Sequence, residues 1–444
     1  MERLREEIVK VIREEGVVGA GGAGFPTYVK INSNVEFVIA NGVECEPLLK
    51  VDQHLMENFP KKIIEGLKLV IKATNAKKGF IALKEKYKKA ITKLNENLKN
   101  EKNIEIFTLK NFYPAGDEQI LVYNVLNRIV PELGIPLNVG VVVDNVGTLY
   151  NISNAYEGKP VISRFLTITG AVKNPLTIEA AIGSSIKELI EFAGGVIIDD
   201  PIFIEGGPLM GKIIQPENSF VTKTTTSIIV LSKKDFVSNV KNENISRSIK
   251  LAKTLCIQCN TCTENCSRNS LGHNIKPHLL MRKIAFKSEI DETFSDAFLC
   301  SECGLCSYFA CPMNLKPHRV IQYIKSELIK KGIKPKDINK NPTADKFYNN
   351  KRVPAYKLIK RIDLEKYESE APLVNKYYEP ERVVVLLKQH IGAPSIPVKN
   401  ENSKVKKYEL IADIPENQIG SKIHSPINGR IKKVTKNFIE IIKE

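Results

Sequence analysis

Eight of the nine cysteines stand in two short runs, "CIQCNTCTENC" from Cys256 and "CSECGLCSYFAC" from Cys300. The first run is spaced C-x2-C-x2-C-x3-C, and the second C-x2-C-x2-C-x4-C followed by Pro312. Closely spaced thiolates of this kind suit a loop that wraps one corner of a cubane, as in bacterial 4Fe-4S ferredoxins. A zinc ribbon would use two separated CxxC pairs instead. The runs therefore predict two 4Fe-4S clusters.

The ligands of each predicted cluster come from both runs. In two-cluster ferredoxins the fourth cysteine of each run ligates the other cluster. One cluster is predicted to be held by Cys256, Cys259, Cys262 and Cys311. The other is predicted to be held by Cys300, Cys303, Cys306 and Cys266.

The similarity of the two runs extends into the residues that follow them. "NIKPHLLMRKI" follows the first run and "NLKPHRVIQYI" the second. Each predicts a helix with proline in its first turn, which indicates an internal duplication. His278 and His318 occupy equivalent places, either as hydrogen-bond donors that tune a cluster or as residues that only pack or cap. Because Ser267 and the longer second run make the halves unequal, we expect two different cluster potentials.

Composition bounds the class of protein. The chain has 444 residues and 43% hydrophobic residues, enough for about three or four domains. Its net charge of +16 comes from lysines spread through every segment, which favours a solvated surface over a nucleic-acid site. No signal peptide or apolar run of membrane-spanning length is apparent, so we expect a soluble, cytoplasmic protein. Structural disulfides are rare in that compartment, which supports metal ligation by the cysteines.

A glycine-rich turn, "GVVGAGGAGFPTYVK", runs from Gly16 to Lys30. Glycine lets backbone amides approach a phosphate or a flavin closely. The turn lacks the Gly-Lys-Ser/Thr ending of a P-loop and follows a helical pattern, so it fits neither a P-loop nor an ordinary Rossmann site. By itself the turn is weak evidence for a cofactor.

Four motifs in order, "GAGGAGFPTYVK", "NGVECEPLL", "YPAGDEQ" and "VVDNVGT", resemble the FMN- and NADH-binding domain of a known superfamily. Its members include the flavoprotein subunit of respiratory NADH dehydrogenase, the C subunit of the Rnf complex and the PduS-type cobalamin reductases. The resemblance implies a cofactor-binding set of Gly19, Gly21, Gly22, Gly24, Phe25, Lys30, Asn41, Glu44, Glu46, Gly116, Glu118, Asn145 and Thr148.

The resemblance also implies roles within that set. The FMN phosphate and ring edge would be held by Gly19, Gly21, Gly22 and Lys30. Asn41 and Glu44 would lie along the isoalloxazine. Phe25 would stack on the nicotinamide or adenine, and Glu46 would lie near the nicotinamide ribose.

The rest of the set closes the cleft. Gly116 and Glu118 would line the nucleotide cleft, and Asn145 and Thr148 would close over the phosphoribityl chain. Two positions depart from the respiratory subunit, because Ala20 replaces an arginine and Asp117 the first of two glutamates.

The predicted fold class is multidomain α/β and α+β. The predicted parts are a Rossmann-like FMN/NADH domain (1–158), a β-grasp SLBB domain (159–235), a helical dicluster ferredoxin-like domain (236–335), an extended linker arm (336–380) and an all-β barrel-sandwich hybrid (381–444). Within these parts, the sequence predicts a helix from Ser185 to Phe192 and a polar linker from about Asp235 to Ser248. The last part lacks the modified lysine of a biotinyl or lipoyl carrier.

The whole-chain resemblance, including the small barrel in last place, favours the PduS-type family. It implies an enzyme that moves electrons from NADH through FMN and two 4Fe-4S clusters to cobalamin in propanediol utilisation. No catalytic acid or base is required. The implied partners are NADH, cobalamin carried on an adenosyltransferase, microcompartment proteins and further subunits. Two alternatives stay open: an Rnf-like or amino-acid-reductase subunit with a protein acceptor, and a non-catalytic assembly protein.

Overall fold

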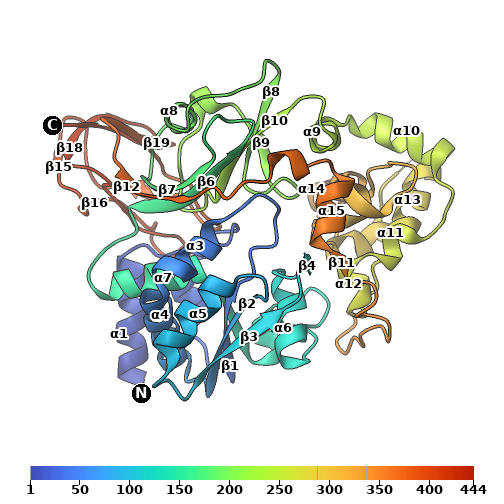
Figure 1. The fold of residues 1–444 in the computed structure, drawn as a ribbon, viewed down its shortest axis with the longest axis horizontal. Coiled ribbons are helices and arrows are strands. Elements are labelled where there is room, and N and C mark those ends of the chain that lie inside the picture. The colour runs from blue at the N-terminus through green and yellow to red at the C-terminus, as the bar shows by residue number, and fades with distance from the viewer. Residues whose placement is uncertain (1, 288, 336–337) are drawn as a thin grey trace.

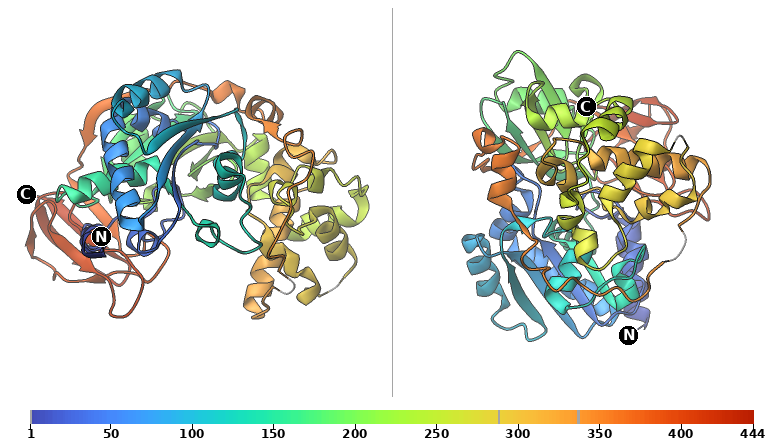
Figure 2. Two further views of the ribbon diagram at one scale, coloured as in Figure 1. Left: turned by 90° about the horizontal axis from the view of Figure 1, so that it is seen from below. Right: turned by 90° about the vertical axis from the view of Figure 1, so that its right-hand side faces the viewer.

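The computed structural model describes residues 2–287, 289–335 and 338–444. The boundary predicted between the cluster domain and the arm, at 335 and 336, touches residues outside these ranges. Figures 1 and 2 show the C-terminal β-structure and the cysteine-rich helices at opposite ends of the molecule, with the N-terminal domain and the second sheet between them. None of the helices in the described ranges is long and apolar enough to cross a membrane.

The N-terminal domain is built on a four-stranded parallel sheet in the order β3-β2-β1-β5. Its strands are β1 (Phe37–Gly42), β2 (Lys78–Lys84), β3 (Ile104–Leu109) and β5 (Val141–Asn145), with β4 (Phe112–Tyr113) apart. Its helices are α1 (Glu2–Glu14), α2 (Thr27–Ile31), α3 (Val51–Asn58), α4 (Pro60–Thr74), α5 (Lys88–Leu98), α6 (Glu118–Leu126), η1 (Pro136–Val139) and α7 (Val146–Tyr156). Because β2 and β3 lie on one side of β1 and β5 on the other, the strand order reverses between β1 and β5.

Helices bury both faces of this sheet. Val38 and Ala40 of β1 pack with α1, α3, α4 and α7, whereas Ile39 packs with α6. Successive side chains of a strand point to opposite faces, so an uninterrupted apolar run fills both cores. The polar residues that end β1 and β5 are thereby held at one rigid edge.

Gly66 marks the crossing of α4 and α7. A Cβ at this position would overlap the carbonyl oxygen of Leu149. Glycine to alanine in a helix normally gains about 1 kcal/mol. Here the contact is with backbone, so the helices must separate, and overpacking of this kind costs about 1–3 kcal/mol. We expect Gly66→Ala to lower the free energy of unfolding in urea, whereas the exposed Lys61→Ala in the same helix changes it little. A higher urea midpoint for Gly66→Ala would contradict the packing argument.

The second domain is a six-stranded sheet in the order β12-β7-β6-β10-β8-β9. Its elements are β6 (Ser163–Gly170), β7 (Leu176–Ala181), α8 (Ile186–Phe192), β8 (Pro201–Glu205), β9 (Lys212–Ile214), η2 (Pro216–Asn218), β10 (Ser227–Ser232) and, from the arm, β12 (Leu373–Tyr378). The β6-β7 hairpin lies beside β10, which runs parallel to β6. The predicted helix is present, and the Ser185 side chain caps it by accepting from the backbone N–H of Glu188 at 3.4 Å.

The cysteine-rich part is helical. Its elements are α9 (Phe236–Asn242), α10 (Ile245–Leu255), α11 (Thr261–Glu264), α12 (Ser267–Ser270), α13 (Pro277–Phe286), η3 (Glu292–Leu299), η4 (Cys306–Ala310) and α14 (Pro317–Lys330). The polar linker predicted from Asp235 is wrong, because α9 and α10 occupy it. Asn244 caps α10 by accepting from the backbone N–H of Arg247, and Val237 and Val240 of α9 are buried.

The arm is anchored to the N-terminal domain and to the second domain. Its β11 (Val353–Pro354) pairs antiparallel with β4, and its β12 pairs parallel with β7. Between them lie α15 (Ala355–Arg361) and η5 (Glu365–Tyr367). The C-terminal part has two small sheets, β13-β19-β18-β15 and β14-β16-β17. Their strands are β13 (Arg382–Leu386), β14 (Ile396–Pro397), β15 (Lys404–Val405), β16 (Leu410–Asp413), β17 (Ile423–His424), β18 (Gly429–Val434) and β19 (Phe438–Lys443).

Candidate functional site

The switch point between β1 and β5 gathers several of the predicted cofactor residues. Asn41 is the penultimate residue of β1, and its side-chain amide donates to the carbonyl oxygen of Gly116 at 2.9 Å. Asn145 ends β5 and caps α7 by accepting from the backbone N–H of Gly147 at 2.8 Å. Its amide also donates to Asp52 Oδ2 at 2.8 Å. In open α/β sheets, ligands bind in the crevice at such a point.

The glycine turn lies over these strand ends. The backbone N–H of Ala20 donates to Thr148 Oγ1, which is fully buried, at 2.8 Å. A Cβ on Gly21 would lie 3.4 Å from that of Asn145, whereas one on Gly22 would meet nothing within 4 Å. The turn therefore packs on one side and leaves open space on the other.

Two members of the predicted set at the end of the turn serve packing. Gly24 has a φ of +71°, and a Cβ there would lie 2.6 Å from the Thr224 methyl group and 3.1 Å from His390. Phe25 is half-buried, and its carbonyl oxygen accepts from the backbone N–H of Gly19 at 2.9 Å. The predicted stacking role of Phe25 stays a prediction.

Lys30 is tied to the sheet beneath the turn. Its Nζ donates to the Val143 carbonyl oxygen at 2.9 Å and to Asp144 Oδ1 at 3.1 Å. Burial lowers the pKa of Lys30, but the carboxylates of Asp144 and Glu118 outweigh it and the net shift is upward. Burial in turn raises the pKa of Glu118. The lysine is thus held charged at the base of the candidate cleft.

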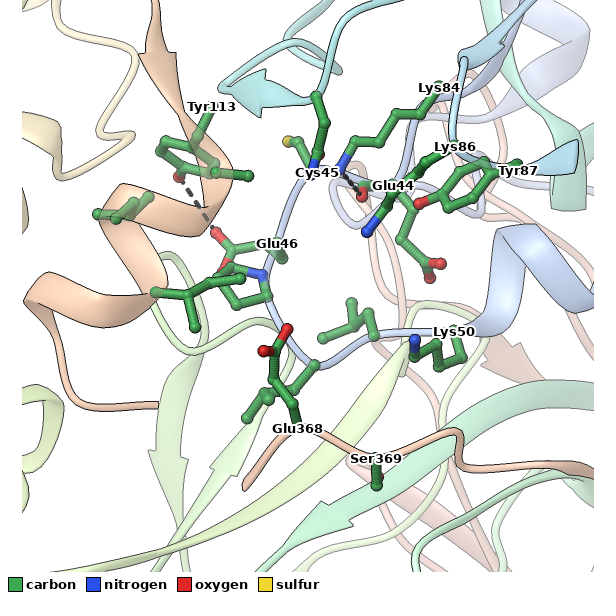
Figure 3. A pocket seen from close by; sticks show the side chains of 17 residues that line it. Glu44, Cys45, Glu46, Lys50, Lys84, Lys86, Tyr87, Tyr113, Glu368 and Ser369 are labelled. Atoms are coloured by element: carbon green, nitrogen blue, oxygen red, sulfur yellow. Dashed lines mark hydrogen bonds between the residues drawn. The ribbon is translucent and has the colours of Figure 1, made fainter. Parts of the chain in front are cut away.

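Glu44, in the loop after β1, lies against Asp52 at the start of α3. Glu44 Oε1 accepts from the backbone N–H of Asp52 at 3.2 Å, and its Oε2 is buried without a partner. Burial, together with Asp52, raises the pKa of Glu44 to about 8. Lys84 donates to the Glu44 carbonyl oxygen at 3.0 Å, as Figure 3 shows. Glu44 therefore holds a proton at neutral pH.

This proton makes stability depend on pH. Between the ordinary pKa of 4.5 and about 8, the folded state binds more protons at Glu44 than the unfolded state. The free energy of unfolding therefore falls as pH rises through this window, by up to about 1.4 kcal/mol per pH unit. We expect Glu44→Gln to flatten that slope in denaturation from about pH 5 to pH 8. The exposed Glu85→Gln is the control, and an unchanged slope for Glu44→Gln would argue against this assignment.

Glu46 is bound by the second domain. Its carboxylate accepts from the backbone N–H groups of Leu209 and Met210 at 2.9 and 3.1 Å and from the Tyr113 hydroxyl at 3.2 Å. Glu44, Glu46 and Tyr113 are among the residues that line one pocket, and Figure 3 shows Glu46 and Tyr113 on the same wall of it. With these three donors in place, its predicted contact with a nicotinamide ribose stays a prediction. Burial raises the pKa of the adjacent Cys45 thiol to about 12, so this cysteine is not a reactive thiolate.

The residues present fit a flavin nucleotide. In the described part of the chain, the backbone N–H groups of Gly21, Gly22 and Ala23 have no protein acceptor. Successive free amides of this kind bind anionic oxygens such as those of a phosphate. The orphaned Glu44 Oε2 and the buried, unpartnered Asp144 Oδ2 lie at the same strand edge. Unpartnered polar atoms of this kind suit the N–H, O–H and carbonyl groups of a flavin and its ribityl chain.

The structure sorts the cysteines across the two runs. Within the described ranges, no cluster of His, Cys, Asp and Glu is tight enough to hold a single metal ion. Four sulfurs line one cavity and form what we name the first cysteine group: Cys256, Cys259, Cys262 and Cys311. The others lie together as the second cysteine group: Cys266, Cys300, Cys303 and Cys306. The final cysteine of each run thus lies with the opposite triple, which is the arrangement that two cubanes would need.

Donors already point at several sulfurs. The Gln258 amide lies 3.0 Å from Cys256 Sγ, and the backbone N–H of Glu302 donates to Cys300 Sγ at 3.3 Å. Burial, together with Cys266 and Cys303, raises the pKa of the Cys300 thiol to about 12. Four crowded thiols without a metal resist ionisation, and cluster iron would supply the missing positive charge.

The duplicated histidines hold the two cysteine loops. His278 Nδ1 lies 2.7 Å from Thr263 Oγ1, and His318 Nδ1 lies 2.7 Å from Ser307 Oγ. Thr263 and Ser307 each follow the third cysteine of a run. Burial lowers the pKa of His318 to about 3, so the ring is neutral. These contacts position the loops and do not place a charge beside a sulfur.

The two cysteine groups differ in their surroundings. The Tyr113 hydroxyl donates to the Cys303 carbonyl oxygen at 2.8 Å, so the second group lies against the N-terminal domain. In the first group Cys259 is exposed, and nearby in the same loop Ile257 has 63% of its surface accessible. The first group therefore opens to solvent at the far end of the molecule.

Two contributors were missed by the sequence analysis. The Arg164 guanidinium, fully buried in β6, donates to the carbonyl oxygens of Ala20 at 2.5 Å and Thr225 at 2.9 Å. It also stabilises the charge of Asp52, whose pKa burial raises. No short motif contains either residue, and Arg164 comes from another domain. Only the tertiary structure brings them to the turn.

Four family models match successive parts of the chain. They are the Nuo51 FMN-binding domain at residues 12–154, the SLBB domain at 165–212, the 4Fe-4S dicluster domain at 255–316 and the RnfC barrel sandwich hybrid domain at 361–443. The predicted flavin, β-grasp, dicluster and barrel-sandwich parts are confirmed. With the cleft and the cysteine groups, they define a flavin and iron–sulfur oxidoreductase.

Similar proteins narrow this class. The cobalamin reductase PduS of Citrobacter freundii is 38% identical over 434 residues, covering 97% of this chain and 95% of the relative. That of Salmonella typhimurium is 38% identical over 440 residues, covering 99% and 97%. The chain belongs to the PduS cobalamin reductase family. The C subunit of the Na(+)-translocating ferredoxin:NAD(+) oxidoreductase complex of Acetobacterium woodii is 37% identical over 268 residues, covering 59% of this chain and 58% of that protein.

One solved structure is similar over part of its length. A chain of an NAD+-reducing [NiFe]-hydrogenase matches with a TM-score of 0.48 and 18% identity, covering 75% of this chain and 63% of that chain.

Proposed function

We propose that this protein transfers electrons from NADH through FMN and two 4Fe-4S clusters to cobalamin, reducing the cobalt stepwise to cob(I)alamin. The observation that carries the proposal is the contact between the candidate flavin cleft and the second cysteine group, made by the Tyr113 hydroxyl and the Cys303 carbonyl oxygen. Near full-length similarity to two cobalamin reductases supports cobalamin as the acceptor.

The protein's own residues bind, orient and connect. FMN, when bound, takes an electron pair from NADH and releases single electrons, which the clusters carry. The free amides of the glycine turn would bind the flavin phosphate, and Thr148 holds the turn in place. Asn41 and Asn145 fix the floor of the cleft. The second cysteine group would receive electrons first, and the exposed first group would pass them out.

The deciding experiment is anaerobic oxidation of NADH with hydroxocobalamin as acceptor, using protein loaded with FMN and both clusters. We expect loss of NADH absorbance together with the spectrum of reduced cobalamin. An artificial dye is the control acceptor. Rapid dye reduction without cobalt reduction would overturn cobalamin as the acceptor.

A protein acceptor is the second candidate. The exposed Cys259 beside Ile257 gives a partner protein direct access to the first group. Similarity to the Acetobacterium woodii protein over 59% of the chain also favours it. We further propose that the protein works in the cytoplasm, within a microcompartment and as part of a complex. Its cobalamin would be bound to an adenosyltransferase. Co-purification of the protein with the compartments and with the adenosyltransferase tests both proposals. A non-catalytic assembly role predicts an empty flavin cleft and clusters that are only structural, so NADH would not reduce them.

A further inference from the structure

A buried ion pair joins the candidate flavin cleft to the second cysteine group. Arg268 Nη1 donates to Asp117 Oδ1 at 2.5 Å, and Nη2 donates to Oδ2 at 2.9 Å. The two side chains are only 10% and 15% exposed. A two-pronged guanidinium–carboxylate pair fixes angle as well as distance, which a lysine could not do.

Each partner lies beside predicted cofactor residues. Asp117 stands between Gly116 and Glu118, and its carboxylate also accepts from the backbone N–H groups at the start of α6. Arg268 lies in α12, two residues after Cys266. The pair therefore links the rim of the cleft to α12, the short helix that begins directly after Cys266 of the second group.

A second contact makes the link rigid. The Tyr113 hydroxyl lies between two acceptors, the Cys303 carbonyl oxygen at 2.8 Å and Glu46 at 3.2 Å, and shares its single proton between them. With the Arg268–Asp117 pair, it attaches two separate loops of the second group to the same domain. Two attachments at different points restrict sliding and most rotations of the second group. Removing one partner of the ion pair would leave the other charge buried and unpaired, which is strongly unfavourable.

We propose that Asp117 and Arg268 are positioning residues that fix the distance between the flavin and the second cluster, and that their charges set the potential of that cluster. This rests on the proposed function. One electron leaves the flavin for each electron that the cluster gains, and no covalent bond forms or breaks. Electron transfer slows steeply with distance, so a small displacement of the cysteine loops changes its rate.

The charges of the pair have opposite electrostatic effects. The positive Arg268 beside the second group stabilises the added electron and raises the cluster potential. The negative Asp117 lowers it. Removing either charge loosens the clamp, but the two removals move the potential in opposite directions. This pattern separates a charge effect from simple loss of structure.

The test uses Arg268→Met, Arg268→Lys and Asp117→Asn in fully loaded protein. Asparagine is itself a good N-cap, so Asp117→Asn removes the charge and leaves the cap of α6. Arg382→Met, which breaks an Nε–Oε1 ion pair of 2.6 Å with Glu440 in the C-terminal part, is the matched control. Flavin and iron contents, NADH-to-dye activity, the rate of cluster reduction and the cluster potentials are measured for each protein.

We expect Arg268→Met and Arg268→Lys to keep NADH-to-dye activity, because the dye takes electrons from the flavin itself. Cluster reduction should slow several-fold in Arg268→Met, because electron transfer slows steeply with distance, and less in Arg268→Lys. The second-cluster potential should fall in Arg268→Met and rise in Asp117→Asn. Hydrogen exchange of residues 113–121 and 263–273 should quicken in both. Arg382→Met should match the parent protein in every measurement.

Several outcomes would overturn the proposal. If the parent protein does not reduce its clusters with NADH, the proposed function fails. If the parent does and the Arg268 and Asp117 variants reduce clusters equally fast, the clamp fails while the function stands. Potentials that move in the same direction would remove the charge effect. Should Arg268→Met not retain both cofactors, Arg268→Lys and Asp117→Asn decide the question.

Discussion

We expect the Cys300→Ser variant to lose cobalamin reduction completely while it still reduces an artificial dye with NADH. Cys300 lies in the second cysteine group, which is in contact with the candidate flavin cleft through Cys303. A hydroxyl is a much poorer iron ligand than a thiolate, so the first relay after the flavin is lost. The dye accepts electrons from the flavin itself and bypasses that relay.

The measurement is a pair of anaerobic assays on one folded, flavin-loaded preparation. Cys45→Ala is the matched control, because the Cys45 thiol lies outside both groups and is buried, and it should retain both activities. Cys259→Ser extends the test: the second cluster should still be reduced by NADH, but cobalamin should not. Equal loss of dye and cobalamin reduction in Cys300→Ser would contradict the proposed order of electron flow.

The features that could be predicted from the sequence are those whose partners lie close together along the chain. The three-residue intervals within each run fix which cysteines share a loop. The exchange of Cys266 and Cys311 between the two groups follows the ligand pattern of two-cluster ferredoxins. The Ser185 cap and the proline starts of α13 and α14 likewise depend on neighbours within four residues. Short-range rules suffice where the partners are close in sequence.

The missed features depend on contacts between distant segments. Arg164 reaches Ala20 across 144 positions, and Arg268 reaches Asp117 across 151. The sequence does not distinguish a buried arginine from an exposed one, because the partners of a buried arginine depend on how the domains pack. The α9 helix was missed for a related reason: its two buried valines are separated by polar residues that gave no strong period.

Lys30→Met should cost about 3–5 kcal/mol of folding stability, because it leaves Asp144 buried without a counter-charge. Asp144 is only 1% exposed, its Oδ1 depends on Lys30 at 3.1 Å, and its Oδ2 has no partner. Burial also raises the pKa of Asp144. The loss should therefore be largest above that pKa and shrink as pH falls and the carboxyl takes up a proton.

The double variant Lys30→Met with Asp144→Asn tests whether Lys30 also binds the flavin. With no charge left to bury, it should regain most of the stability in urea denaturation of the flavin-free protein. If Lys30 contacts the flavin phosphate, FMN affinity stays low in the double variant. Full recovery of both stability and affinity would make Lys30 purely structural. Lys68→Met, which breaks a 2.5 Å surface pair with Glu101, is the control and should cost at most about 1 kcal/mol.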